Sequence, residues 1–259
     1  MAANAPPMRK NPQRADKVMI EVKDVYKSFN GRPVIQGVSL DVREHEVVAI
    51  IGTSGCGKST LLKLIANLIE PDEGEIILRD ENFSLVFQYS ALFDSLNIFE
   101  NVAFSLLEEI DEPQGKRKKY KQSEMAKIVS EKLEMVGLEG IERKYPNELS
   151  GGMKKRVSFA RAIVGNPKII LYDEPTAGLD PIASTMTEDY ILKLRNELNA
   201  ASIVVTHQFS TIERTADRVC LLHEGKICWE GTPEELMQSD DPYARQFAHA
   251  SLEGPMAPN

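Results

Sequence analysis

The residues best suited to chemistry lie between Gly52 and Ser59, where the sequence matches the phosphate-binding pattern G-x-x-x-x-G-K-[ST]. Glycines in such a loop let successive backbone N–H groups turn inward around an anion, and a helix that starts there adds the positive end of its dipole. Lys58 would reach the β- and γ-phosphates, and the Ser59 hydroxyl would bind Mg²⁺. The pattern therefore predicts a nucleoside triphosphate site formed by Gly52, Thr53, Ser54, Gly55, Cys56, Gly57, Lys58, Ser59 and Thr60.

The segments on either side of this loop have the character that the pattern requires. Residues 47–51 are apolar and largely β-branched, which predicts a strand buried on both faces. Residues 60–68 carry leucine and isoleucine at helical spacing. A Gly-rich loop alone is more often an ordinary turn, but the strand–loop–helix context argues against that alternative.

Further candidates follow two other apolar runs. Asp173 and Glu174 come directly after residues 169–172. In a chain that binds phosphates, the first carboxylate is expected on Mg²⁺ and the second near the attacking water. His207 follows the strand-like run 202–206. A lone histidine is more often structural, but parallel sheets place ligands at the carboxyl ends of their strands, which favours a functional His207.

Two features elsewhere are candidates for the same ligand. Ser150, Gly151 and Gly152 precede a helical pattern, and a serine cap with free amides and the helix dipole forms an anion site. The alternative is that they only cap the helix. Phe29 lies just before a predicted turn and can stack on an adenine ring, with ordinary core packing as the alternative.

The composition limits the class of protein. The chain has 259 residues, 42% of them hydrophobic, which is enough for one core with an attached subdomain. A net charge of −8 argues against nucleic acid as the main partner, and no apolar run approaches the roughly 20 residues that cross a bilayer. Cys56, Cys220 and Cys228 form no disulfide framework, which predicts a reducing compartment. Residues 1–17 lack the apolar stretch of a secretory signal and are expected to form a disordered leader.

Strand patterns come first along the chain. Residues 18–29 and 34–42 alternate between apolar and polar around a turn at Asn30 and Gly31, which predicts a β hairpin. Two short strand-like runs follow at residues 75–78 and 84–87.

The remaining segments are mainly helical. Residues 89–137 predict an inserted helical subdomain. Within it, the charged run 108–122 predicts a solvated loop, with contact to anionic lipid headgroups as the alternative. Short strands at 218–222 and 226–230 precede a tail, 241–259, that we expect to be peripheral.

These segments together resemble the ATP-binding subunit of ABC transporters over residues 18–231. The resemblance rests on an ordered set of motifs: residues 52–59, Gln88, 149–153, 169–174, 177–180 and His207. It implies an α/β fold, with a P-loop NTPase core around a parallel sheet, a small antiparallel β-subdomain and an inserted helical subdomain at about residues 89–159. A C-terminal helix and tail occupy residues 232–259.

The resemblance also implies a role for each site residue. Glu174 would be the general base, His207 would contact the γ-phosphate, and Gln88 would sense Mg²⁺ and water. Ser59, Gln88 and Asp173 would bind Mg²⁺. Asp180 would communicate between protomers, while Ser150, Gly151 and Gly152 would complete the ATP site of a second copy, so that catalysis needs a homodimer around two Mg-ATP.

Within this superfamily, residues 90–96, 149–157 and 172–182 look like the Mla-type phospholipid-trafficking ATPases, and residues 246–255 are similar to the cyanobacterial and chloroplast branch of that group. This likeness implies lipid cargo, an integral-membrane permease and a lipid-binding MCE-type protein, with no nucleic acid partner. The location would be the cytoplasmic face of the inner membrane, or the stromal side in an organelle. The alternative function is a soluble ABC-type ATPase outside transport, for which tandem units or a long coiled coil would be expected.

The sequence departs from the usual superfamily pattern in two places. Met153 stands where most members have glutamine, a change that the Mla-like group shares. The interval from Gly74 to Gln88 is shorter than usual, which predicts that the antiparallel subdomain and the helix leading to Gln88 are trimmed. We expect the permease to contact residues 91–99, with core packing as the alternative. Cys56, at a helix start, is expected to have a lowered pKa and redox sensitivity, with a buried, inert thiol as the alternative.

Overall fold

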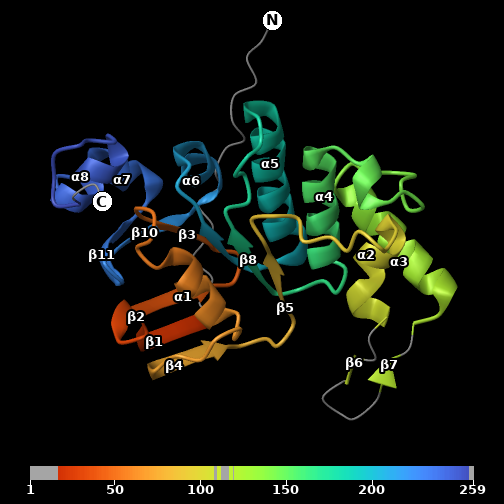
Figure 1. Cartoon of the computed structure of the whole chain (residues 1–259), viewed down its shortest axis with the longest axis horizontal. Coiled ribbons are helices and arrows are strands. Elements are labelled where there is room, and N and C mark those ends of the chain that lie inside the picture. The colour runs from red at the N-terminus through yellow and green to blue at the C-terminus, as the bar shows by residue number, and fades with distance from the viewer. Residues whose placement is uncertain (1–16, 108–109, 112–116, 119, 257–259) are drawn as a thin grey trace, which may run out of the picture.

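The computed structural model describes residues 17–107, 110–111, 117–118, 120–256, and its centre is a six-stranded sheet of order β11-β10-β3-β9-β8-β5 (Figure 1). The strands are β3 (Val47–Ile51), β5 (Phe83–Val86), β8 (Ile169–Asp173), β9 (Ala201–Val205), β10 (Arg218–His223) and β11 (Lys226–Gly231). All neighbours are parallel except β10 and β11. Every residue of β3 and β9 is buried, which explains why these runs are almost entirely apolar.

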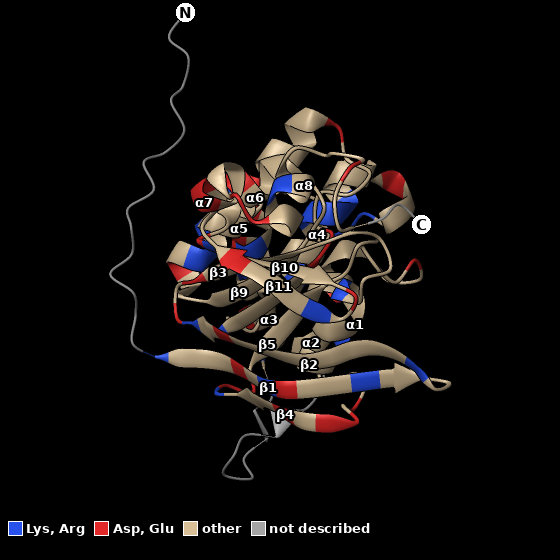
Figure 2. Ribbon diagram, turned by 90° about the vertical axis from the view of Figure 1, so that its left-hand side faces the viewer, with Lys and Arg blue, Asp and Glu red and all other residues tan. Residues whose placement is uncertain are grey.

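A second sheet, of order β2-β1-β4, is antiparallel and lies beside the first (Figure 2). Its strands are β1 (Val18–Phe29), β2 (Arg32–Arg43) and β4 (Glu73–Leu78), and the predicted hairpin between β1 and β2 is confirmed. Helix α1 (Lys58–Ile65) packs with both sheets in one apolar cluster. Only residues 79–82 connect β4 to β5, and the described chain has no helix between β4 and Gln88. Trimming relative to the rest of the superfamily stays a prediction.

The other face of the six-stranded sheet carries the remaining helices. Helices α4 (Gly151–Ala162) and α5 (Pro181–Leu198) pack against it, and α2 (Ile98–Leu107) and α3 (Gln122–Met135) extend this layer at one end, as Figure 1 shows. Two short paired strands, β6 (Ile110–Asp111) and β7 (Arg117–Lys118), lie between α2 and α3 in the chain. A 3₁₀ turn, Pro146–Glu148, lies between α3 and α4. The predicted solvated loop 108–122 falls largely outside the described residues.

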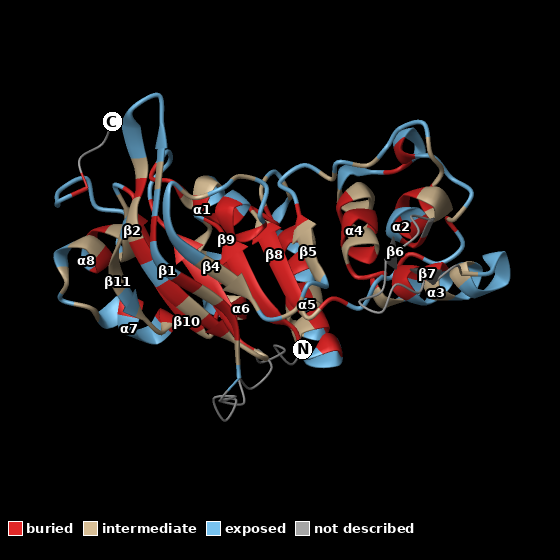
Figure 3. Cartoon of the chain, turned by 90° about the horizontal axis from the view of Figure 1, so that it is seen from below, coloured by how far each residue is buried: buried red, intermediate tan, exposed pale blue. Residues whose placement is uncertain are grey.

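The C-terminal helices cover the opposite end of the same face. Helices α6 (Phe209–Thr215), α7 (Pro233–Gln238) and α8 (Pro242–Ala248) form a core cluster with β3 and β10. The prediction of a peripheral tail is wrong for residues 241–256, because Ala244 is fully buried and the Gln246 side chain forms two hydrogen bonds, of 2.7 and 2.8 Å, with the Met256 backbone. Residues 257–259 lie outside the described residues. Figure 3 shows how much of the central strands these layers bury.

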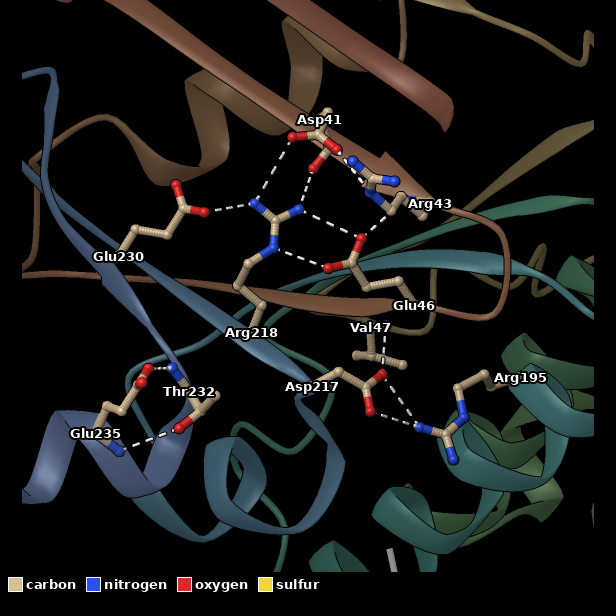
Figure 4. A network of polar contacts seen from close by, with 10 residues as sticks. All are labelled: Asp41, Arg43, Glu46, Val47, Arg195, Asp217, Arg218, Glu230, Thr232 and Glu235. Carbon is tan, nitrogen blue, oxygen red and sulfur yellow. Dashed lines mark hydrogen bonds and ion pairs between the residues drawn. The ribbon is translucent and has the colours of Figure 1, made fainter. Parts of the chain in front are cut away.

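An ionic network joins the two sheets at the end where β3 and β10 begin (Figure 4). The Arg218 Nε lies 2.8 Å from Glu46 Oε1, and its Nη1 lies 2.7 Å from Glu230 Oε1. Its Nη2 donates to the Asp41 carbonyl on β2. Arg218 and Glu46 are each less than a tenth exposed, so this network holds the antiparallel sheet against the central one.

Candidate functional site

The phosphate loop connects β3 to α1 at the carboxyl edge of the central sheet. Gly57 caps α1 with φ of 111° and no side-chain cap, so the first amides of the helix stay free for an anion. A Cβ on Gly52 would overlap the Leu222 carbonyl, and one on Gly57 would lie 2.9 Å from the Val34 carbonyl. Both positions also have left-handed φ, so the loop needs glycine at each.

The Lys58 ammonium lies within this loop. It donates to the Gly52 carbonyl at 2.8 Å and to the Thr53 carbonyl at 3.0 Å. Next to it, the Ser59 hydroxyl donates to Asp173 Oδ1 at 3.0 Å, although the two residues are far apart in sequence. Burial raises the pKa of Asp173, and the hydrogen bond from Ser59 opposes that shift. The parallel sheet therefore brings two of the three predicted Mg²⁺ ligands, Ser59 and Asp173, together.

The carboxylate of Glu174 meets His207 at the same edge. Glu174 Oε1 lies 2.8 Å from His207 Nδ1, and its Oε2 is buried with no hydrogen-bond partner among the described residues. Glu174 is 9% exposed, whereas the His207 side chain is 62% exposed. One carboxylate oxygen is thus oriented by the imidazole and the other is available for a further donor.

Gln88 lies two residues after the end of β5. Because β5 pairs in parallel with β8 and Val86 lies opposite Tyr172, the chain leaves the sheet beside Asp173. The side chain of Gln88 is exposed, and its carbonyl accepts a hydrogen bond of 2.8 Å from Lys155 on α4. The structure therefore places Gln88 on the same edge as the carboxylates.

Other predicted residues do not join this cluster within the chain. Ser150 caps α4 by accepting a hydrogen bond from Met153 N, and a Cβ on Gly151 or Gly152 would meet no atom within 4 Å. Helix α4 lies on the face of the sheet opposite α1. Asp180 likewise caps α5, with two hydrogen bonds of 3.0 Å to backbone amides.

Phe29 is exposed at the end of β1, so it is not core packing. The residue is 44% exposed, and the Lys27 ammonium lies 5.6 Å from the ring centroid. This exposure rules out core packing and leaves the ring accessible to a ligand.

Of the two alternatives for Cys56, the structure supports the buried thiol and not the reactive one. The residue is 7% exposed, and burial raises the pKa of its thiol even though Lys58 lowers it. The predicted lowering of the pKa is therefore wrong, because the loss of hydration outweighs the nearby ammonium and amides.

A buried hydrogen-bond chain that the sequence did not reveal supports the loop after Glu174. Thr176 Oγ1 lies 3.0 Å from Thr211 Oγ1 on α6, and the Thr211 hydroxyl donates to the fully buried Glu188 on α5 at 2.8 Å. Arg214 Nε lies 2.9 Å from the other oxygen of Glu188. A carboxylate at a core-facing helix position is a sequence signal that could have pointed to this chain.

Lys155 was also missed, although a signal for it was present. It belongs to a run of cations that looks solvated, yet it is one turn before Phe159 and so shares that residue's buried face of α4.

No helix in the described part of the chain has the length and apolar character needed to cross a membrane.

Comparisons with known proteins agree with this geometry. A family model described as "ABC transporter" matches residues 35–177. The chloroplastic protein TRIGALACTOSYLDIACYLGLYCEROL 3 of Arabidopsis thaliana is 45% identical over 92% of this chain and 76% of its own length. A protein of Mycobacterium leprae described as "probable ribonucleotide transport ATP-binding protein mkl" is 37% identical over 92% of this chain and 71% of its own length.

Among solved structures, the dimeric ATP-binding cassette MJ0796 with bound ADP and Pi superposes with a TM-score of 0.73, at 31% identity, over 83% of this chain and 99% of its own. The predicted fold class is thereby confirmed, and the phosphate loop, carboxylate pair and histidine found above lie on that fold. The chain belongs to the ABC transporter family and is its ATP-hydrolysing, ATP-binding subunit.

Proposed function

We propose that this ATPase powers a membrane-embedded permease that moves phospholipid or a related lipid across a cell envelope. The observation that carries the proposal is the edge constellation of Ser59, Asp173, Glu174 and His207, in a chain 45% identical to a relative named after a galactolipid. The name of the mycobacterial relative denotes ribonucleotide transport instead. The two related ATPase subunits are therefore named after different cargoes, so the cargo of this chain needs its own experiment.

In the proposed mechanism, Glu174 is the general base for the attacking water. Its unpartnered Oε2 is free to accept a hydrogen bond from that water, while His207 orients Oε1 and would contact the γ-phosphate. Lys58 would leave its loop carbonyls for the phosphates, and the amides of residues 52–60 would bind their oxygens. Phe29 would stack on the adenine.

The residues present fit Mg²⁺. Ser59 and Asp173 offer two oxygen ligands 3.0 Å apart, and Gln88 would supply a third. In the described part of the chain, no group of three or more His, Cys, Asp and Glu side chains could hold a metal alone. Asp173 is the one carboxylate among the three proposed ligands, as expected where Mg²⁺ binds through one or two carboxylates and the nucleotide phosphates. The ion would supply charge neutralisation at the phosphates.

A homodimer would complete each ATP site. Ser150, Gly151 and Gly152 present a capped helix start with open glycines, on the face of the sheet opposite α1. In a head-to-tail pair they would bind the γ-phosphate held by the partner, and Asp180 would lie at the shared interface. The MJ0796 cassette is itself dimeric.

The further partners proposed are the permease and an MCE-type lipid-binding protein. The subunit would then sit at the cytoplasmic face of the inner membrane, or on the stromal side in an organelle. Its net charge of −8 is consistent with no nucleic acid partner.

The catalytic proposal is tested with Glu174→Gln. The amide cannot take a proton from water, whereas Lys58, Ser59 and Asp173 still bind Mg-ATP, so we expect unchanged ATP affinity and a turnover lowered by about 10² to 10⁴. Fluorescent-nucleotide titration and phosphate release measure the two quantities. Turnover at the parental rate would show that Glu174 is not the base.

The cargo is tested by purifying the complex from membranes. Mass spectrometry should find permease subunits and co-purifying lipid, and ATP should drive lipid movement in proteoliposomes for the parent but not for Glu174→Gln. A complex that carries no lipid and moves none would refute lipid transport while leaving the ATPase assignment intact.

A further inference from the structure

Two cations on α4 hold the backbone of the segment that carries Gln88. The Lys155 ammonium donates to the Phe87 carbonyl at 2.9 Å and to the Gln88 carbonyl at 2.8 Å. Further along the same helix, the Arg161 guanidinium donates to the Ser90 carbonyl at 3.2 Å and to the Ala91 carbonyl at 2.8 Å. Residues 87–91 are therefore bound to α4 through their carbonyl groups at both ends.

Burying a charged ammonium costs free energy, which indicates that Lys155 has a role beyond packing. Lys155 is only 4% exposed, and the hydrogen bonds of its ammonium among the described residues go to the Phe87 and Gln88 carbonyls rather than to a carboxylate. Burial lowers the pKa of its ammonium to about 8, although the charges of Asp173 and Glu174 raise it. An ammonium in such a place requires hydrogen-bond partners, and the only ones described are the two carbonyls.

The same helix carries Ser150, Gly151 and Gly152 at its start. Val157, Phe159 and Ala160 are buried in the core cluster, so α4 is a packed, rigid element between these two features. In the proposed dimer, the start of α4 would bind the γ-phosphate of the ATP held by the partner. If this binding displaced α4, the carbonyls bound to Lys155 and Arg161 would move with the helix.

We propose that Lys155 and Arg161 are positioning residues that fasten the Gln88 segment, residues 87–91, to α4, so that Gln88 and the start of α4 move as one body. The proposal rests on the catalytic role proposed for Gln88. It links the two ATP sites of a dimer, because the part of α4 that completes the partner's site would also set the position of Gln88 in its own.

The experiment measures steady-state ATP hydrolysis and thermal unfolding of the full chain in its membrane complex. The variants are Lys155→Met, Arg161→Met, Gln88→Ala and the double variant Lys155→Met with Gln88→Ala. Lys168→Met is the matched control, since the Lys168 ammonium also donates to a backbone carbonyl, that of Leu198 at 3.0 Å, away from the site.

We expect Lys155→Met to lower kcat about 10- to 100-fold with KM for ATP unchanged, because the phosphate loop is intact and only Gln88 loses its position. Lys155→Arg, which keeps a charged donor, should restore most of kcat. In the Gln88→Ala background, Lys155→Met should cost no further activity, the non-additivity expected of coupled residues. Lys168→Met should leave kcat unchanged.

Two results overturn the inference and are distinguishable. If Gln88→Ala has parental kcat, the proposed role of Gln88 fails and the inference fails with it. If Gln88→Ala is impaired but Lys155→Met lowers kcat by the same factor with or without Gln88, the role of Gln88 stands and the fastening is wrong. Should Lys155→Met not fold, Arg161→Met in the same cycle with Gln88→Ala decides by the same criterion.

Discussion

The ionic network around Arg218 gives a sharp stability prediction for Arg218→Met. The change leaves Glu46, 9% exposed, as a buried carboxylate whose remaining hydrogen bond comes from the Arg43 amide. Breaking a buried pair by removing one partner costs about 3–5 kcal/mol. Glu230 adds little, because its side chain is 44% exposed. At roughly 2–4 °C per kcal/mol for a chain of this size, we expect Tm to fall by roughly 6–20 °C.

Differential scanning calorimetry measures this shift, with Arg79→Met as the control. The Arg79 side chain is 53% exposed where it meets Glu21 at 3.3 Å, and such surface pairs contribute about 0–1 kcal/mol. Adding Glu46→Gln to Arg218→Met should recover part of the lost stability, because no buried charge is then left unpaired. Equal shifts for Arg218→Met and Arg79→Met, or no recovery with Glu46→Gln, would refute the reasoning.

Three other predictions follow from the site and its surroundings. Because burial raises the pKa of the Cys56 thiol, maleimide should label it far more slowly in the folded protein than after denaturation, as peptide mass mapping would show. Phe93 is 43% exposed, and its ring centroid lies 4.8 Å from that of Phe104. The double variant Leu92→Ser with Phe93→Ser should therefore still fold and bind ATP but should not co-purify with the permease. Burial lowers the pKa of Lys155 from 10.5, its ordinary value, to about 8 in the folded protein. The unfolded chain therefore binds more protons between these limits, and the stability of the parent should rise with pH relative to Lys155→Met across pH 8–10.5.

Each has a contrary outcome. Rapid labelling of folded Cys56 that Mg-ATP slows would mean a reactive thiol in the site. A Leu92 and Phe93 double variant that melts early and loses ATP binding would assign these residues to the core, where Leu92 is already partly packed. Parallel pH profiles of Tm for the parent and Lys155→Met would show that Lys155 is not the titrating group.

The phosphate loop could be predicted from sequence because its signals are local. Strand β3, the glycines and α1 are contiguous, and the periods of 2 and 3.6 residues identify each element. The meeting of Ser59 with Asp173 also followed, since parallel strands end at one edge of a sheet. Element order and site chemistry were therefore accessible together.

What the sequence did not reveal depends on contacts between distant segments. The spacing from Phe159 places Lys155 on a buried face, but only packing against residues 87–91 shows which carbonyls its ammonium binds. Gln246 and Met256 gave no periodic signal, because a side-chain amide bonded to backbone groups has no sequence pattern. The pKa of Cys56 was misjudged because nearby charge can be read from sequence but desolvation cannot.

Glu174 has a backbone conformation that ordinary side chains avoid. Its φ is 46°, yet its amide still donates to the Val205 carbonyl at 2.9 Å, so the sheet ladder holds the residue there. A non-glycine residue in this region carries a strain of about 1–2 kcal/mol. Glycine would relieve that strain but remove the carboxylate. Because Glu174 is the proposed general base, selection for stability and selection for turnover would pull in opposite directions at this one position, and searches for thermostable variants should recover inactive Glu174→Gly chains.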